Sequence, residues 1–268
     1  MDQFAPVKVY RYSGENIEAS QDRVVREAPV TLFLNDEELV TLVCSPAGLE
    51  ELAVGFLCGE GILNQPGDLK NITVNEEQGL IWVETNTPAK PPETFLKRYL
   101  TTCCGKGRAS FYFVNDARGI SPLNPGDFRI SPENIRELAA ALESRAELFR
   151  STGGAHGAAL CRPGGIIAFF EDVGRHNAVD KVIGRCFLNN LPLADKALVL
   201  SGRVSAEILI KSARMGLPMV ISRSAPTDLA LQLAGELGVT VAGFVRGDRI
   251  NLYTHPERVT GQETGDRR

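Results

Sequence analysis

The sequence of 268 residues has no excess of basic side chains and no long apolar run. Lys and Arg number 29 against 33 Asp and Glu, a formal charge of −4, whereas a general nucleic-acid-binding protein carries a basic excess or a basic stripe. No segment approaches the roughly 20 apolar residues that a membrane-spanning helix needs. The first residues, MDQFAPVKVYRYSG, lack the apolar stretch behind a basic flank that marks a signal peptide. We therefore expect a cytoplasmic protein with no nucleic-acid partner and no membrane partner.

Metal-binding patterns are missing as well. The three histidines, His156, His176 and His255, lie far apart in the sequence, and no cysteine pair has the C-x-x-C spacing of zinc sites. The H-x-E…P-C-x-x-C signature of zinc deaminases is also absent. A chain of this length can bury roughly 70–75% of its unfolded surface, so it needs no metal to hold a core. We expect no metal site.

Six cysteines are present, and they fall into two groups. Cytoplasmic thiols stay reduced, so we expect no structural disulfides. The first group lies in apolar strand or helix patterns, where a free cysteine packs as a small hydrophobic residue. Its members are Cys44, Cys58, Cys161 and Cys186.

Cys103 and Cys104 form the second group, because they are neighbours within the segment Thr101–Arg108. Adjacent Cα atoms are about 3.8 Å apart, whereas disulfides prefer roughly 4.4–6.8 Å, so a bond between these two would be strained. Residues 97–108 hold four basic side chains and no acidic one, and positive neighbours favour the reactive thiolate. Packed cysteines beside a solvated basic rim would be the plain alternative. The combination of adjacent cysteines, glycines and basic residues favours chemistry.

The first part of the chain is expected to be rich in strands. Residues 30–43 and 72–83 each read as a hairpin around a polar turn. Between them, Ser45 is a candidate N-cap and Pro46 a candidate first residue of a helix. A cluster of Pro, Asn and Gly near residue 125 indicates a boundary. We expect an α+β domain over 1–125, with the reactive loop 101–108 near its end, and a second domain over 126–268.

The second part alternates strands and helices, which predicts an α/β domain with a largely parallel sheet flanked by helices. Ser131 and Pro132 open a helix whose apolar face extends to Phe149. Further helices are expected at 177–188, 206–215 and 227–237. Strands are expected at 158–161, 166–170, 197–200, 219–222, 239–245 and 250–254.

Polar residues gather where several of these strands end. Open α/β sheets bind ligands at the carboxyl ends of their strands, and backbone N–H groups, hydroxyls and guanidinium groups there suit a phosphate. Helix capping and solvated charges would explain one or two of these residues, but not all of them together. We therefore expect a phosphorylated ligand. The segments are Glu171–Asn177, Ser201–Arg203, Ser222–Thr227 and the turn Phe244–Arg249.

These motifs resemble the family of formate dehydrogenase accessory sulfurtransferases, FdhD/NarQ, from about residue 20 to residue 258. The matching runs are Arg26–Val30, Leu52–Leu57, Gly59–Ile62, Cys103–Lys106, Thr152–His156, Glu171–Ala178, Asp180-Lys181, Ser201–Arg203, Ser224–Thr227, Gly243–Arg246 and Tyr253. The resemblance implies a sulfur carrier that takes persulfide sulfur from a cysteine desulfurase. It would pass this sulfur to a molybdenum or tungsten bis(molybdopterin guanine dinucleotide) cofactor before formate dehydrogenase receives it.

The same resemblance implies a homodimer, and a C-terminal domain like the three-layer cytidine deaminase fold without its zinc. His176 and Asn177 would then stand near the place of a deaminase's first ligand and its glutamate. Cofactor contacts are expected from Phe244, Val245, Arg246, Gly247, Asp248, Arg249, Ser201, Gly202, Arg203, His176 and Asn177.

The reactive loop departs from the family pattern C-G-x-C-G. Cys104 and Gly105 match its first two positions, Gly107 stands where the second cysteine would fall, and Cys103 is additional. Our hypothesis is that Cys104 carries the persulfide, with Cys103 assisting or substituting. Two alternatives stay open: a non-catalytic chaperone that binds the molybdenum cofactor, and a thiol-based redox sensor.

Overall fold

The computed structural model describes residues 2–86, 98–99, 107–108, 119–124, 126 and 128–260. The reactive loop predicted at 101–108 is therefore described only at its last two residues. These form strand β8 (Gly107–Arg108), which pairs antiparallel with strand β7 (Arg98–Tyr99).

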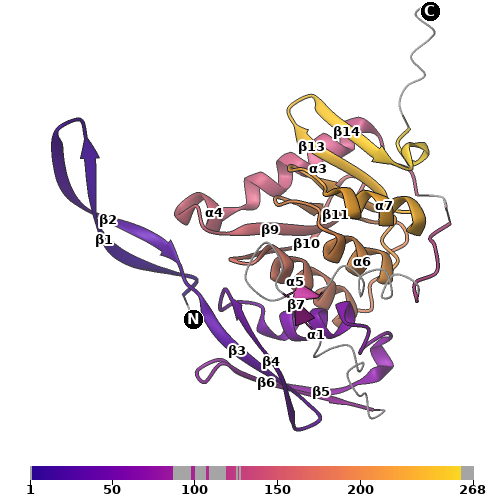
Figure 1. Cartoon of the computed structure of the whole chain (residues 1–268), viewed down its shortest axis with the longest axis horizontal. Helices are drawn as coiled ribbons and strands as arrows, with labels where there is room; N and C mark the ends of the chain where they lie inside the picture. The colour runs from indigo at the N-terminus through magenta and orange to yellow at the C-terminus, as the bar shows by residue number, and fades with distance from the viewer. Residues whose placement is uncertain are drawn as a thin grey trace, which may run out of the picture.

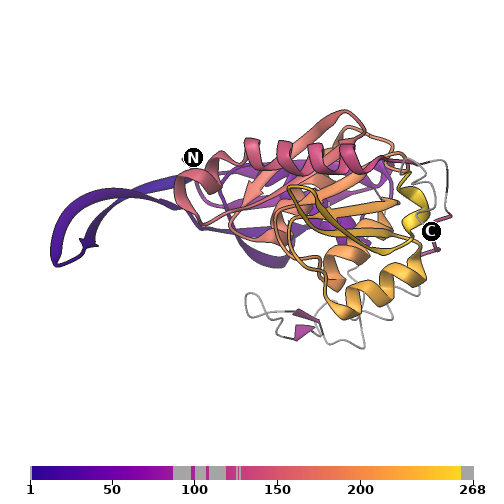
Figure 2. The same ribbon diagram turned by 90° about the horizontal axis from the view of Figure 1, so that it is seen from above.

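A long two-stranded arm opens the chain and projects from the body of the molecule (Figures 1 and 2). It consists of β1 (Phe4–Ser13) and β2 (Asn16–Val25), paired antiparallel over their whole length. The sequence did not lead us to expect this arm, whose residues are mostly exposed on both faces. Large apolar side chains such as Tyr10, Tyr12 and Ile17 are exposed on it.

A four-stranded sheet follows, and it confirms both predicted hairpins. Asn35 and Asp36 turn the first one with positive φ angles of 49° and 68°, which suits a two-residue hairpin turn. The strand order is β4-β3-β6-β5. The strands are β3 (Ala28–Leu34), β4 (Glu37–Cys44), β5 (Leu69–Asn75) and β6 (Leu80–Thr85).

Helix α1 (Leu49–Gly59) lies between the two hairpins, but its predicted start was wrong. Its N-cap is Gly48, with φ 66°, and not Ser45. Ser45 is fully buried and its polar groups are bonded to a later part of the chain. A single turn of 3-10 helix, η1 (Pro66–Asp68), then leads into β5.

The second part of the chain builds a six-stranded sheet in the order β10-β9-β11-β12-β13-β14. The strands are β9 (His156–Arg162), β10 (Gly165–Asp172), β11 (Ala197–Leu200), β12 (Met219–Ser222), β13 (Thr240–Arg246) and β14 (Arg249–Thr254).

The expectation of a largely parallel sheet was wrong. Only the pairings β11–β12 and β12–β13 are parallel, and the other three are antiparallel. Tight turns join β9 to β10 and β13 to β14, whereas a parallel pair needs a crossover of a dozen or more residues.

Helices cover both faces of this sheet, which gives three layers (Figure 1). Helix α3 packs on one face, and α5, α6 and α7 pack on the other. The helices are α3 (Pro132–Arg145), α4 (Glu147–Thr152), α5 (Arg175–Leu188), α6 (Ala206–Arg214) and α7 (Asp228–Leu237), and η2 (Pro256–Arg258) follows β14. Within the described ranges, no helix is long and apolar enough to cross a membrane.

The helix predicted to run from Ser131 to Phe149 is in fact two helices. Ser131 caps α3 as predicted, with its hydroxyl accepting from the Asn134 amide at 3.1 Å. The chain breaks at Ala146, where ψ is 71°. Helix α4 then starts in a new direction and leaves Phe149 51% exposed.

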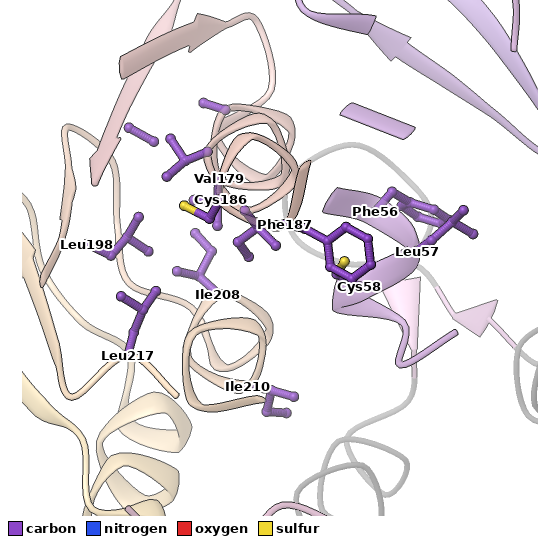
Figure 3. Close-up of a cluster of buried hydrophobic side chains, with 14 of the residues drawn as sticks. Phe56, Leu57, Cys58, Val179, Cys186, Phe187, Leu198, Ile208, Ile210 and Leu217 are labelled. Carbon is purple, nitrogen blue, oxygen red and sulfur yellow. The ribbon is translucent and has the colours of Figure 1, made fainter. Parts of the chain in front are cut away.

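Helices α1 and α5 cross so closely that their backbones touch. A Cβ atom added at Gly55 would lie 1.7 Å from the Asp180 carbonyl oxygen, and one at Gly184 would lie 1.9 Å from that of Glu51. Only glycine permits this approach. One apolar core therefore continues from α1 through α5 and α6 to the six-stranded sheet, as Figure 3 shows. The division at residue 125 stays a prediction.

The four cysteines expected in the core are buried there, which confirms that prediction. Cys58 of α1 and Cys186 of α5 lie in the cluster drawn in Figure 3. Burial raises the pKa of Cys44, Cys161 and Cys186 to about 12 and that of Cys58 further still. These thiols stay protonated at neutral pH and are poor nucleophiles.

Candidate anion-binding edge of the sheet

The polar segments found in the sequence meet at one edge of the six-stranded sheet. Leu200 at the end of β11 pairs with Ser222 at the end of β12 and with Ala158 near the start of β9. Asp172 at the end of β10 pairs with His156. Because β13 runs parallel to β12, its carboxyl end lies at this edge too.

Hydrogen bonds join these segments into a continuous rim. The Ser201 hydroxyl accepts from the Gly157 amide at 2.9 Å, and the Ser222 hydroxyl donates to the Gly202 carbonyl at 2.7 Å. Ser222 also accepts from the Ser224 amide at 2.9 Å, and the Ser224 carbonyl accepts from the Phe244 amide at 3.1 Å. The rim therefore has a fixed backbone shape.

A shallow depression in the surface of this rim, which we call the pocket, is shaped by a glycine. A Cβ atom added at Gly202 would lie 3.3 Å from the Arg175 Cδ and 3.4 Å from the His156 Nδ1. The missing side chain lets these two groups approach the backbone of the β11–α6 connection. The residues that line the pocket are Gly157, Arg175, Leu200, Gly202, Arg203 and Ile208.

The positive charge at the pocket comes from Arg175 and Arg203, because the two histidines near them, His156 and His176, are neutral. Burial, and then the positive charge of Arg175, lowers the pKa of His156, and Arg203 lowers it further. Burial lowers the pKa of His176 to about 4 in spite of the Glu207 carboxylate. Its Nε2 atom lies 3.0 Å from the Ser205 hydroxyl. Neutral imidazoles beside Arg175 and Arg203 give a site suited to an anion with several oxygens.

Further arginines continue the rim toward β13. Arg223 forms an ion pair with Glu143 of α3, and its carbonyl accepts from the Arg246 Nε at 2.9 Å. Phe244 has a positive φ of 52°, at an irregularity in the pairing of β13 with β14. The Arg249 guanidinium lies 5.1 Å from the centre of the Phe244 ring. The predicted segment Phe244–Arg249 thus borders the rim through Phe244 and Arg246, while Gly247 and Asp248 form an exposed turn.

Asn177 lies differently from the other predicted cofactor contacts. Its side-chain amide donates to the Asp172 carboxylate at 2.9 Å and to the Val43 carbonyl at 2.8 Å. It therefore binds the β10–α5 connection to the end of β4.

The structure places two further residues at the pocket, Arg175 and His156. Arg175 stood in the segment Glu171–Asn177, which the sequence marked for a phosphorylated ligand, but it was not named among the expected cofactor contacts. His156 stood only in the family motif Thr152–His156. The sequence carries no local signal for it, because it is the first residue of β9 and reaches this edge only through the antiparallel pairing of β9 with β11.

The reactive cysteines predicted at 103 and 104 lie outside the described residues. The residues on either side, Tyr99 and Gly107, are register partners, as are the basic residues Arg98 and Arg108. In the described part of the chain, no three His, Cys, Asp or Glu side chains are grouped so that they could hold a metal ion.

Fold and site define a three-layer α/β protein with an arginine-lined rim at the carboxyl ends of its strands. Residues 25–260 match the model of the FdhD/NarQ family, and the chain belongs to that family.

The most similar relatives include proteins named sulfur carrier protein FdhD. The one from Listeria innocua is 42% identical over 261 residues, covering 97% of this chain and 100% of its own. The one from Bacillus subtilis is 43% identical over 252 residues, covering 94% and 95%. Among solved structures, that of a formate dehydrogenase accessory protein from Desulfotalea psychrophila superposes with a TM-score of 0.81 at 28% identity. It covers 97% of this chain and 100% of its own.

Proposed function

We propose that this protein is a sulfurtransferase that moves sulfur from a cysteine desulfurase to the molybdenum or tungsten bis(molybdopterin guanine dinucleotide) cofactor of formate dehydrogenase. The family and the names of its relatives support a sulfur carrier linked to formate dehydrogenase. The arginine-lined rim carries the finer proposal, because it offers an anionic substrate both charge and fixed backbone amides.

The first step would take place at Cys104. Its thiolate attacks the terminal sulfur of the desulfurase persulfide, the donor S–S bond breaks, and the donor cysteine leaves as a thiolate. A new persulfide then stands on Cys104, with no net oxidation. The basic residues between 97 and 108 favour the thiolate that this attack requires. Cys103 would assist or substitute.

The second step needs the cofactor to be held as a substrate beside this persulfide. A bis(guanine dinucleotide) carries pyrophosphate groups, and guanidinium groups bind such oxygens through paired, charge-assisted hydrogen bonds. Arg203 and Arg246 are exposed at the rim and Arg175 lines the pocket. Gly202 would let Arg175 lie against the backbone of the β11–α6 connection, so that its guanidinium and that of Arg203 would bind the phosphates together.

The proposal extends to partners and location. Formate dehydrogenase would receive the sulfurated cofactor, the protein would act in the cytoplasm, and two copies would form a homodimer. The arm offers apolar surface for such contacts, since Tyr10 and Tyr12 are 59% and 75% exposed and an isolated two-stranded hairpin is only marginally stable in water.

Two variants separate the carrier step from the binding step. We expect Cys104→Ala to lose persulfide when the protein is incubated with a desulfurase and cysteine and its mass is measured. We expect Arg203→Ala to keep persulfide loading and to bind guanosine diphosphate about tenfold more weakly in calorimetry. Arg162→Ala, an exposed arginine at the far end of β9, is the matched control and should change neither property.

The outcomes also decide between the alternatives. Full persulfide on Cys104→Ala would overturn the assignment of that cysteine, and unchanged nucleotide affinity of Arg203→Ala would overturn the binding site. Complementation of formate dehydrogenase activity by Cys103→Ala/Cys104→Ala would favour a non-catalytic chaperone. A reversible disulfide without any sulfur transfer would favour a redox sensor.

A further inference from the structure

Asp172 lies at the centre of a buried polar network beneath the rim. Asp172, Lys181 and Ser45 are each 0% exposed. The Lys181 ammonium donates to the Asp172 Oδ2 at 2.5 Å and to the Ser45 carbonyl at 3.0 Å. The Ser45 amide donates to the same Oδ2 at 3.0 Å. The network therefore joins the end of β10, helix α5 and the β4–α1 connection.

The other carboxylate oxygen of Asp172 holds the turn that leads into α5. Oδ1 accepts from the Gly174 amide at 2.8 Å and from the Asn177 side chain at 2.9 Å. The amide of Val173, which lies between Asp172 and Gly174 in the chain, donates to the Ser45 hydroxyl at 3.0 Å. The backbone of 173–174 is thus bonded on both sides, immediately before Arg175 enters the pocket.

Four donors surround this carboxylate, and only an ionised carboxylate can accept from all of them. An asparagine amide in its place would keep one acceptor oxygen. Its NH₂ group would point two N–H donors at groups that are themselves hydrogen-bond donors. Asp172→Asn would keep the size of the side chain but break the bonds on one side of it. Because buried polar networks are costly when half satisfied, the turn would move.

A second buried pair on the same helix has a different position. Asp180 and Lys211 are 2% and 3% exposed, and the Lys211 ammonium donates to both carboxylate oxygens of Asp180 at 2.7 and 2.8 Å. This pair joins α5 to α6 and bonds to no backbone amide of the 173–174 turn. Its chemistry matches that of Asp172 and Lys181, so it provides a control.

We propose that Asp172 is a positioning residue of the anion site: it acts through the 173–174 turn to set Arg175 and His176 at the start of α5. This inference rests on the proposed function, since it assigns a role toward the substrate bound at the rim. The same network would transmit the position of the β4–α1 connection to the pocket, because Ser45 in that connection bonds to both the Asp172 carboxylate and the Val173 amide.

The test compares Asp172→Asn with Asp180→Asn in the full-length protein. Inorganic pyrophosphate is the probe, titrated by calorimetry, and hydrogen exchange of residues 173–177 is followed by mass spectrometry without ligand. We expect Asp172→Asn to bind pyrophosphate about tenfold more weakly and to exchange faster over 173–177. Asp180→Asn should lower the melting temperature while its pyrophosphate affinity and its exchange over 173–177 stay at wild-type values.

Three results would overturn the inference: wild-type affinity in Asp172→Asn, equal losses of affinity in both variants, or unchanged exchange over 173–177. If Asp172→Asn does not fold, Ser45→Ala replaces it, because that change removes only the acceptor of the Val173 amide and should still weaken binding by about twofold. Failure of the wild-type protein to bind pyrophosphate would instead contradict the proposed binding site. Hydrogen exchange would then decide the positioning role by itself.

Discussion

Helix α5 contributes one residue to each of two buried Asp–Lys pairs, which are chemically alike and differently connected. Asp172 and Lys181 share their network with backbone groups of residues 45 and 174. Asp180 and Lys211 bond mainly to each other, with Glu207 3.5 Å from the lysine. A buried ion pair is weak evidence for stability by itself, because desolvation offsets the attraction. What each pair is attached to therefore decides what it does.

The difference separates two roles for the same chemistry. The first pair is attached to a turn that borders the pocket, so its loss should change the pocket as well as the fold. The second connects two helices inside the core, so its loss should change stability alone.

The largest effect is expected from Lys181→Met. Asp172 would stay buried with its charge uncompensated, which typically costs about 3–5 kcal/mol of unfolding free energy. Urea denaturation at neutral pH measures it. Lys211→Met should cost less, because burial raises the pKa of the Asp180 carboxyl to about 7 and the group can take up a proton. A larger loss in Lys211→Met would remove the distinction between the pairs.

A somewhat smaller loss is expected from Gly184→Ala. The new methyl group would press on the Glu51 carbonyl of α1, and such overpacking costs about 1–3 kcal/mol. Gly235→Ala in α7 is the matched control, since nothing lies within 4 Å of its position and alanine favours a helix by about 0.5–1 kcal/mol. Because α5 contributes Lys181 to one pair and Asp180 to the other, Gly184→Ala should disturb both. Thermal unfolding of the two variants shows whether the α1–α5 contact is as tight as its geometry implies.

An intermediate effect should appear in the pH dependence of stability. Burial lowers the pKa of His176 to about 4 from 6.5, so the folded protein binds fewer protons than the unfolded chain between these values. The contribution of His176 is present above pH 6.5 and is lost as the pH falls toward 4. The difference in unfolding free energy between wild type and His176→Gln should change by about 2–3 kcal/mol over this range. A difference that is constant with pH would contradict the burial of a neutral imidazole.

The smallest effect is expected from Ser45→Ala. The substitution leaves the Val173 amide without its acceptor, at a cost of about 1 kcal/mol, and keeps the ion pair of Asp172. Urea denaturation measures this loss. Ser212→Ala in α6 is a control of similar burial, because its hydroxyl only donates to the Ile208 carbonyl of its own helix. Equal losses in both variants would show that Ser45 has no special place in the network.

Much of the fold could be predicted from local patterns. Strand β12 has the predicted bounds, and most of the other strands and helices of the second part lie within two residues of theirs. The errors have identifiable physical causes. Ser45 looked like a helix cap because serine commonly is one, but its partners Asp172 and Val173 lie 127 and 128 positions away. The prediction merged α4 with α3, because the spacing of apolar side chains does not reveal where the helix axis changes direction.

The candidate site, like the fold, could be predicted only in part. That polar residues after β10, β11 and β12 would meet could be expected, since the ends of such strands form one edge. That His156 joins them could not be read from its neighbours, because it begins β9 and reaches this edge only through the antiparallel pairing of β9 with β11. Asn177, expected at the cofactor, instead bonds Val43 and Asp172, and only the tertiary fold brings the end of β4 next to the start of α5.

Local patterns in the sequence predicted most of the strands and helices, the four buried cysteines and the position of each polar segment at a strand end, because hydrophobic period and turn residues act over short distances. Tertiary contacts set which strands run parallel, how closely α1 meets α5 and which polar groups share the Asp172 network. The parallel strands pair residues more than twenty positions apart, and the α1–α5 contact and the bonds of Ser45 join residues more than a hundred positions apart, so no local pattern records them.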